Sequence, residues 1–324
     1  MACTMGCTKP MQRDEHAVQV GLGGITVELG EIKRDVEAIP GARERFAALK
    51  LPMSSALLRY RSYRESTLAP CDAIGSVVLR CLERVGVAAA DIDLFVLTSA
   101  DASFLADRKL VPSLLARHGL VRAVPMAIVS QECTGLLSAI HIASSYIRSG
   151  LSRRILVASY DRGGVDADRI QSFGVVSDAA SACLVSSQEP LDFKVLGFAQ
   201  YGDVQGMQGE DDFDQRQALI NRVNAAALAE AGVSLDDIGR VFSTNFFWPL
   251  ASFYAAAAGI PSNLLHDATL LDVGHCLSAD ALLNLDDYHR RAEGRPGQRY
   301  LLQAFAMGLL ASMVVERSSS PLRT

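Results

Sequence analysis

Cys133 has the setting of a reactive thiol. It lies in the segment VSQECTGLLSAI, directly after an apolar run and at the start of a helix expected over 134–148. A thiol at a helix N-terminus faces unpaired backbone N–H groups and the positive end of the helix dipole, and both favour the thiolate. Gly135 permits a close backbone approach at this point. Cys133 is therefore a candidate nucleophile, and the alternative interpretation is an ordinary buried cysteine at a strand end.

A thiolate nucleophile needs a base, and the chain offers six histidines, at 16, 118, 141, 266, 275 and 289. His275 follows the apolar run TLLDVG (269–274), interpreted as a buried strand, and precedes a helix expected over 278–292. This repeats the strand–turn–helix placement of Cys133, so His275 is the favoured base. His266 is the weaker competitor, because it falls in a loop before that strand.

A third turn follows the expected strand RVFSTN (240–245) and begins at Asn245. An amide at this point is suited to fixing a water molecule or donating to an oxyanion. The neighbouring side chains are expected to line an apolar substrate tunnel: Thr244, Phe246, Phe247 and Trp248, the only tryptophan. The alternative is that these rings are ordinary core aromatics.

The strands and helices that would bring these three turns together are predicted from the alternation of apolar runs with segments of helical periodicity. Strands are expected within 17–30 (two, around a glycine turn), at 92–100, 124–131, 153–161, 181–187, 193–201, 240–245 and 269–274, and twice within 300–317. Helices are expected at 70–86, 110–118, 134–148, 213–231, 251–258 and 278–292, with 202–216 as a surface loop. This order predicts an α/β fold with a mostly parallel sheet. The two similar halves, 18–190 and 191–324, indicate an internal pseudo-duplication packed as one body.

Composition excludes several classes of protein. The 324 residues correspond to about two domains, 49% are hydrophobic and the net charge is −5, so a nucleic-acid-binding role is disfavoured. The longest apolar stretches have about 10–12 residues, too few to cross a bilayer. The first 17 residues are expected to be a disordered leader without a secretory signal, which favours the cytoplasm. Seven scattered cysteines without a C-x-x-C pair indicate neither structural zinc nor a disulfide framework.

Five segments in chain order resemble the ketoacyl synthase III-type members of the thiolase superfamily, over about residues 18–317. They are ADIDLFVLTSA, VSQECTGLLSAIHIASSYIRSGLSRRILVASYD, FGVVSDAASACLVSS with Ser177 and Asp178 at its core, VGHCLSADALLNLDDY and AFAMGLLASMVVER. The resemblance implies a thiolase-like fold, in which two pseudo-duplicated α/β halves form a five-layer α-β-α-β-α body.

Departures from this family pattern concern the catalytic motifs. A decarboxylating ketoacyl synthase III has a His-Gln-Ala-Asn motif, and the corresponding segment of this chain reads Ser243-Thr244-Asn245-Phe246. The family's second motif, Gly-Asn-Thr, corresponds to Gly-His-Cys in this chain. The arrangement is similar to that of the classical thiolases, and the implied centre is Cys133, Asn245 and His275. Thiolases also have a second cysteine in the C-terminal hairpin, which here reads Ala306-Met307-Gly308. Cys276 is a candidate replacement for that thiol.

This combination implies a covalent acyl-enzyme. Cys133 would take an acyl group from a thioester with His275 as base, and the backbone N–H groups of Cys133 and Gly308 would hold the carbonyl oxygen. A hydroxyl or amine acceptor needs only one base, so the expected activity is acyl transfer giving an ester or amide, as in secondary-metabolite biosynthesis. The alternatives are a condensing enzyme that forms a carbon–carbon bond and a non-catalytic partner of a ketosynthase. The presence of Cys133 and His275 argues against the last.

The expected acyl donor is a coenzyme A or carrier-protein thioester. Family members that use coenzyme A commonly stack its adenine on a tryptophan in the N-terminal third, and this region has none. It has Arg59, Arg61 and Arg64, which are candidates for binding a pantetheine phosphate or acidic carrier side chains, or else form a solvated helix face. No cofactor or metal is expected, the second substrate is a small molecule, and the resemblance implies a homodimer.

Overall fold

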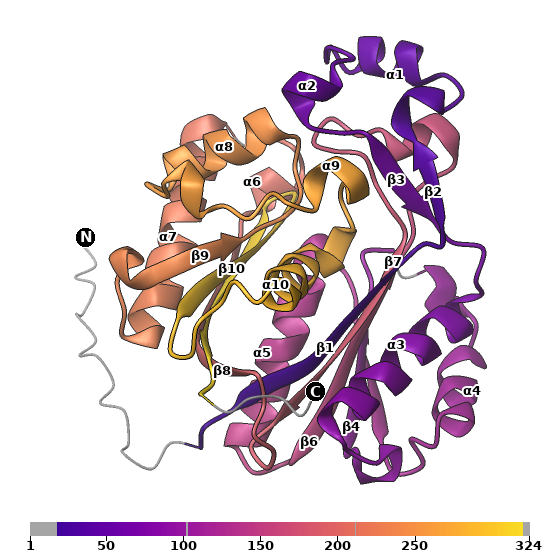
Figure 1. Ribbon diagram of the computed structural model, residues 1–324, viewed down its shortest axis with the longest axis vertical. Coiled ribbons are helices and arrows are strands. Elements are labelled where there is room, and N and C mark those ends of the chain that lie inside the picture. The colour runs from indigo at the N-terminus through magenta and orange to yellow at the C-terminus, as the bar shows by residue number, and fades with distance from the viewer. Residues whose placement is uncertain (1–17, 102, 211, 320–324) are drawn as a thin grey trace, which may run out of the picture.

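A computed structural model describes residues 18–101, 103–210 and 212–319, shown in Figure 1, and the expected leader 1–17 lies outside them. The strands are β1 (Gly21–Leu29), β2 (Ile32–Asp35), β3 (Ser62–Glu65), β4 (Leu94–Thr98), β5 (Val124–Ile128), β6 (Arg154–Asp161), β7 (Ala179–Ser186), β8 (Phe193–Gly202), β9 (Ile238–Phe242), β10 (Arg299–Ala306) and β11 (Leu309–Arg317). The α-helices are α1 (Ala42–Ala48), α2 (Ser55–Leu58), α3 (Pro70–Val85), α4 (Leu110–Arg117), α5 (Gly135–Arg148), α6 (Val204–Met207), α7 (Phe213–Ala231), α8 (Trp248–Ala257), α9 (Leu270–Val273) and α10 (Asp280–Arg290).

Nine strands form one sheet in the order β5-β4-β6-β7-β1-β8-β11-β10-β9. Its two parts meet at a short antiparallel contact, where Gly21 and Leu22 pair with Lys194 and Phe193. We call β5, β4, β6, β7 and β1 the N-terminal half-sheet, and β8, β11, β10 and β9 the C-terminal half-sheet. The first is built from residues 21–186 and the second from residues 193–317.

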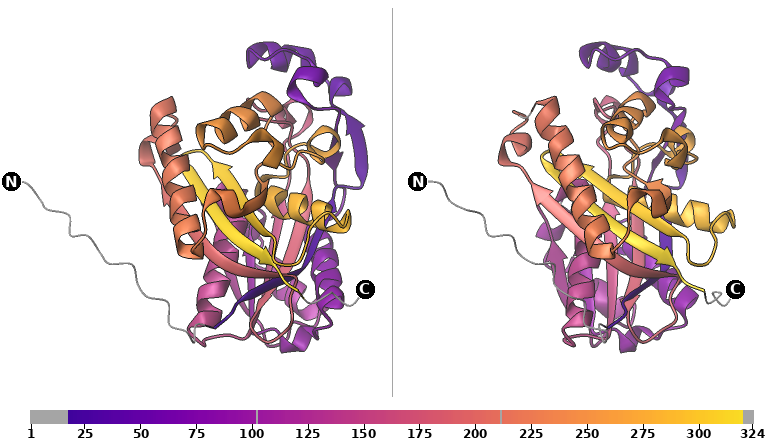
Figure 2. Two further views of the ribbon diagram at one scale, coloured as in Figure 1. Left: turned by 60° about the vertical axis from the view of Figure 1, so that its left-hand side comes forward. Right: turned by 90° about the vertical axis from the view of Figure 1, so that its left-hand side faces the viewer.

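The half-sheets and helices stack in five layers. The helices α3 and α4 cover the outer face of the N-terminal half-sheet, and α7 covers the outer face of the C-terminal one (Figure 2). Between the half-sheets lie α5 and α10, whose apolar side chains share one core with both. The expected thiolase-like α-β-α-β-α body is therefore confirmed.

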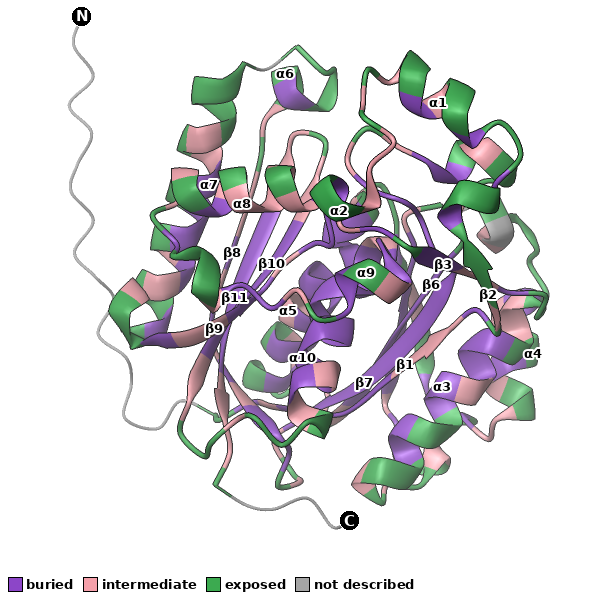
Figure 3. Cartoon of the chain, turned by 45° about the horizontal axis from the view of Figure 1, so that its top comes forward, coloured by how far each residue is buried: buried purple, intermediate pink, exposed green. Residues whose placement is uncertain are grey.

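Burial of α5 on both sides explains its sequence. Leu136, Leu137, Ile140 and Ala143 are fully buried, and Figure 3 shows α5 and α10 as the buried centre of the molecule. A helix between two sheets needs apolar residues on more than one face. The helix that starts beside Cys133 is thus held rigidly by the core.

The glycine turn expected within 17–30 is wrong. This segment contains a single strand, β1, which pairs with β7 on both sides of a register shift between Gly23 and Thr26. Gly24 has a φ of 62°, and a Cβ there would lie 2.8 Å from the carbonyl oxygen of Cys81 in α3. Glycine therefore allows a bulge and a close helix approach rather than a chain reversal.

Two further expectations about local structure need correction. The stretch 202–216, expected to be a surface loop, contains α6 and the first turn of α7, which begins with a capping box between Asp212 and Gln215. No strand was predicted within residues 32–65, which form the antiparallel β2–β3 pair with α1 and α2 between its strands. We call this unit the cap, and it projects from one end of the molecule (Figure 1).

Asp192 lies beside the contact between the half-sheets. Its carboxylate accepts a hydrogen bond from the backbone N–H of Gly24 (3.1 Å) in the bulge of β1. Burial raises the pKa of Asp192 to about 6, against the opposing effects of that hydrogen bond, Arg317 and Arg84. The ionised carboxylate is therefore destabilising at neutral pH.

Asparagine at position 192 is expected to stabilise the protein at neutral pH. The folded state holds its Asp192 proton more tightly than the unfolded state, so the stability contributed by this group falls as pH rises from 3.8 to about 6. Asp192→Asn keeps an acceptor for Gly24 and removes this loss, which gives a gain of about 1–2 kcal/mol at pH 8 that shrinks towards pH 4.5. Urea unfolding at the two pH values measures it, with the exposed Glu83→Gln on α3 as control. A destabilised Asp192→Asn protein at pH 8 would contradict the assignment.

Candidate active site

The turn that carries Cys133 is strained and closely packed. Between β5 and α5, Ser130 and Glu132 have φ angles of 63° and 44°, in the left-handed region that costs non-glycine residues free energy. A Cβ at Gly135 would lie 2.4 Å from the hydroxyl oxygen of Thr98, so only glycine fits. Cys133 lies in the short 3₁₀ turn Glu132–Thr134, with 7% of its surface exposed.

A glutamine from the C-terminal half-sheet supports this turn. Gln200 of β8 donates from Nε2 to Gln131 (3.0 Å) and to the hydroxyl of Thr134 (3.2 Å). Its carbonyl oxygen accepts a hydrogen bond from Ser138 of α5 (2.8 Å). Sequence reasoning missed Gln200, because no local pattern links a strand residue to a turn about 65 positions earlier.

Cys133 and His275 meet at the centre of the molecule, and a third residue completes the arrangement. The Sγ atom of Cys133 lies 3.5 Å from Nε2 of His275. Nδ1 of His275 donates to a carboxylate oxygen of Asp280 at 2.5 Å, and Asp280 also accepts the backbone N–H groups of Asn245 and Cys276, each at 2.7 Å. His275 is fully buried and Asp280 is 1% exposed. These contacts form a Cys–His–Asp chain, in which the carboxylate fixes the histidine tautomer.

Asp280 was missing from the expected site. The sequence signal that could have identified Asp280 is its position as an acidic residue in the first turn of the helix that follows His275. That position also suits a simple helix-start carboxylate, so the sequence alone does not separate the two roles.

The charges within the Cys–His–Asp chain favour a protonated His275 beside a Cys133 thiolate. Burial by itself lowers the pKa of His275, but the charge of Asp280, followed by that of the Cys133 thiolate, raises it to about 10. Burial raises the pKa of the Cys133 thiol, and the charge and hydrogen bond of His275 oppose that increase. A thiolate in this dry site is therefore stable only when His275 is an imidazolium.

His275 does not follow a strand, contrary to the interpretation of 269–274. Most of that segment forms the single-turn helix α9, and Gly274 then turns the chain with a φ of 72°. His275 donates its backbone N–H to Val175 (2.8 Å) and accepts one from Ser177 (2.8 Å), so the loop before β7 holds its backbone. Apolar runs this short fit a helix turn and a strand equally well, which explains the error.

Asn245 lies next to the Gly274–His275 turn, and its side-chain amide points towards that turn. Nδ2 donates to the carbonyl oxygen of Gly274 (2.8 Å) and to the hydroxyl of Thr269 (3.1 Å), while Oδ1 accepts from Asn284 (2.9 Å). Both amide hydrogens are thus used inside the protein. In this arrangement Asn245 supports the backbone before His275.

The aromatic residues that follow Asn245 lie in two different places. The ring of Phe246 lies 6.3 Å from that of His275 and 6.0 Å from Phe173, whose edge-on ring is 5.3 Å from His275. Phe305 of β10 lies 5.7 Å from Phe246, and its backbone N–H donates to Thr244 (3.0 Å). An apolar wall therefore adjoins His275.

Phe247 and Trp248 turn towards the cap instead. Phe247 is 3% exposed and its ring lies 6.3 Å from Phe46. The guanidinium of Arg59 lies 3.8 Å above the ring of Trp248 and is paired with Asp267. The structure thus brings Phe246 to the site but places these two rings under the cap.

Of the other two candidate donor-binding arginines, Arg61 is also paired, whereas Nε of Arg64 is buried without a hydrogen-bond partner among the described residues. Arg61 forms an ion pair with Asp272 of α9, which also pairs with Lys33 (2.8 Å). Arg64 is tied into β3, where its backbone N–H donates to the hydroxyl of Ser177 (2.8 Å). Arg59 and Arg61 therefore reach a donor phosphate only if they leave these carboxylates.

Gly308 and Cys276 occupy well-defined positions. Gly308 forms the β10–β11 turn with a φ of 65°, its carbonyl oxygen accepts the N–H of Asp203 (2.8 Å), and β10 packs against the Cys133 turn. Cys276 is fully buried, and burial raises its pKa well above the usual range. A buried thiol of this kind resists forming the thiolate that proton transfer would need.

Two general features complete the description. In the described part of the chain, no three His, Cys, Asp or Glu side chains are grouped so that they could hold a metal ion. None of the helices in residues 18–101, 103–210 and 212–319 combines the length and apolar character that crossing a membrane requires.

Comparison with known proteins places this chain in a family. Family models for 3-oxoacyl-[acyl-carrier-protein] synthase III and its C-terminal region match residues 129–203 and 228–317, together about half of the chain. The β-ketoacyl-[acyl-carrier-protein] synthase III 3 of Streptomyces coelicolor is 27% identical over 230 residues, which cover 61% of this chain and 68% of that protein.

Solved structures agree on the fold. ChlB3, an acyltransferase, superimposes with a TM-score of 0.81 at 21% identity, covering 94% of this chain and 99% of that one. The 3-oxoacyl-(acyl carrier protein) synthase III of Pseudomonas aeruginosa gives a TM-score of 0.75 at 19% identity, with 93% and 99% covered.

Fold and site together define a thiolase-fold transferase. The chain belongs to the ketoacyl synthase III-like members of the thiolase superfamily. Its activity is therefore of the acyl-transferring or condensing kind.

Proposed function

We propose that this enzyme moves an acyl group from a coenzyme A or carrier-protein thioester onto Cys133 and then to the hydroxyl or amine of a small molecule. The observation that carries the proposal is that His275 is the one base in contact with Cys133 in the described part of the chain. His275 is buried between the thiol of Cys133 and the carboxylate of Asp280, and the hairpin in which thiolases have a second cysteine reads Ala306-Met307-Gly308 here. The acyltransferase ChlB3 is among the proteins of similar fold.

One histidine is sufficient for both half-reactions. The Cys133 thiolate attacks the thioester carbonyl, and the donor thiolate leaves with the proton of the His275 imidazolium. Because the thiolate charge is then gone, one cause of the raised pKa of His275 disappears, which favours the neutral imidazole in the acyl-enzyme. Neutral His275 takes the proton of the acceptor hydroxyl or amine as that group attacks, and the returning Cys133 thiolate is again paired with imidazolium.

Condensation is the second candidate, and it is favoured by the synthase names of the family models and curated relatives. It requires a group that generates or stabilises a carbanion. The amide hydrogens of Asn245 are engaged, and the hairpin residues Ala306 and Met307 have no ionisable side chain. A non-catalytic partner subunit, the third alternative, would not need the Cys133–His275–Asp280 chain.

Product analysis separates these functions. Purified enzyme is loaded with an acetyl or hexanoyl thioester, then offered malonyl-carrier protein in one reaction and a mixture of alcohols and amines in another. Acyl transfer predicts ester or amide products, with the malonyl thioester unchanged. Release of carbon dioxide with a 3-ketoacyl product would establish condensation, and failure to load any acyl group would favour the non-catalytic alternative.

We further infer a homodimer that uses the β5 edge. β5 ends the nine-stranded sheet and has no partner on its outer side in the described part of the chain. Val121, Val124 and Val129, which lie in or beside it, are 74%, 62% and 42% exposed. An exposed apolar edge strand is a template for pairing with a second copy. Analytical ultracentrifugation tests this, because a monomer at micromolar concentration would contradict it.

A further inference from the structure

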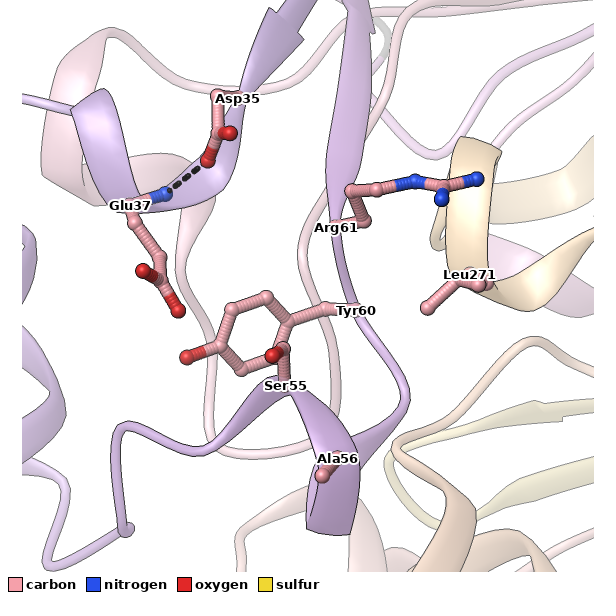
Figure 4. A pocket seen from close by; sticks show the side chains of 7 residues that line it. All are labelled: Asp35, Glu37, Ser55, Ala56, Tyr60, Arg61 and Leu271. Carbon is pink, nitrogen blue, oxygen red and sulfur yellow. Dashed lines mark hydrogen bonds between the residues drawn. The ribbon is translucent and has the colours of Figure 1, made fainter.

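The cap and α9 border an open cavity at the surface, which contains none of the residues of the Cys133 site. Its volume is about 380 Å³, within the range of small-molecule sites. Figure 4 shows side chains from three parts of the cap and from α9 around it: Asp35, Glu37, Ser55, Tyr60, Arg61 and Leu271. Apart from Arg61, a candidate for donor binding, none of its lining residues has a role in the proposed acyl transfer.

Tyr60 lines the cavity and carries a buried hydroxyl group whose hydrogen-bonding capacity is unused. Its side chain is 2% exposed, and its ring stacks on Phe46 with the centroids 5.2 Å apart. Among the residues that the structure describes, none forms a hydrogen bond with the Tyr60 hydroxyl. Burial, then the charges of Glu37 and Asp35, raise the pKa of Tyr60 to about 12, so the hydroxyl keeps its proton. An unpaired buried hydroxyl is costly unless a ligand completes it.

The carboxylates beside Tyr60 are the free charges of the cavity. Asp35 accepts the backbone N–H of Glu37 (2.8 Å), and Glu37 and Tyr60 point towards one another in Figure 4. Within the described ranges, neither carboxylate forms an ion pair, whereas Arg61 is held by Asp272. The cavity thus combines two unpaired anions, a neutral donor and the apolar side chains of Ala56 and Leu271.

We infer that this cavity binds a small organic amine that carries a hydroxyl group. The ammonium group lies between Asp35 and Glu37, and the ligand oxygen accepts the hydrogen bond of Tyr60. The carbon skeleton rests on Leu271 of α9. An anion would be repelled by the two carboxylates, and a hydrocarbon would leave the buried hydroxyl of Tyr60 without a partner, so neither fits as well.

Serinol, an amino diol, is the probe, and glycerol is its matched control because a hydroxyl replaces the amine. Ligand-observed NMR titration of the full chain measures both. We expect serinol to bind at least about tenfold more tightly than glycerol. Tyr60→Phe and Glu37→Gln are each expected to weaken serinol binding about tenfold or more, as for a hydrogen bond to a charged ligand.

Two substitutions outside the cavity serve as controls, and thermal unfolding gives an independent measurement. Tyr63→Phe in β3 and Glu44→Gln in α1 are expected to leave serinol binding unchanged. Without serinol, Tyr60→Phe should unfold at the same or a higher temperature, because it removes an unpaired buried hydroxyl. Absence of serinol binding, equal affinity for glycerol, or unchanged binding by both cavity variants would overturn the inference. A lower unfolding temperature of Tyr60→Phe without serinol would overturn it too, since it would reveal an internal partner.

Discussion

Cys133→Ala abolishes acyl loading. Incubation with an acyl thioester adds the mass of one acyl group to the wild-type protein, and this adduct is absent in the variant, with turnover reduced by about 10³-fold or more. The reason is that Cys133 is the thiol that faces a base, at 3.5 Å from Nε2 of His275. Intact-protein mass spectrometry and a steady-state assay measure the two quantities.

Cys276→Ala is the matched control for this experiment. Cys276 is next to His275 in the chain and fully buried, so it would be the nearest competing thiol. Its replacement is expected to leave the adduct at full yield. An adduct that persists in Cys133→Ala and disappears in Cys276→Ala would refute the assignment of the nucleophile.

Asp280→Asn lowers the rate of acyl loading by about 10²–10⁴-fold in a folded protein. The new amide presents N–H to Nδ1 of His275, which moves the imidazole proton to Nε2 and removes the base that faces Cys133. The negative charge that raises the pKa of His275 to about 10 is also lost, so this pKa falls. The rate of adduct formation and the NMR titration of His275 test the two consequences separately.

Asp286→Asn provides the control on the same helix. Asp286 is 5% exposed and pairs with Arg290 (3.1 Å), away from His275. It is expected to keep the loading rate and the pKa of His275. If Asp280→Asn loads as fast as the wild type, or if the pKa of His275 does not fall, Asp280 does not act on the histidine.

Local sequence patterns located most of the strands and helices and two of the three residues of the Cys–His–Asp chain. The mostly parallel sheet that they predicted is wrong, because only the β4–β5, β4–β6 and β9–β10 pairings are parallel. The helix at Pro70–Val85 begins at a proline and ends at Gly86, with a φ of 68°, as the pattern predicted. The turns of Cys133 and His275 were found because each combines an apolar run, a change of direction and a helix start. These features are encoded within about 15 neighbouring residues, where propensity and periodicity act.

Side-chain direction and long-range pairing were decided only by the tertiary structure. Asn245 was placed correctly along the chain, but its amide is consumed by Gly274 and Thr269. Arg59, expected to meet a donor phosphate, lies over Trp248 and pairs with Asp267. Each of these side chains takes the rotamer in which its polar atoms find hydrogen-bond or ion-pair partners, and those partners are known only once the chain has folded. Residues from Thr98 to Asp280 meet at one centre only after the two half-sheets close on α5, and no local pattern contains that information.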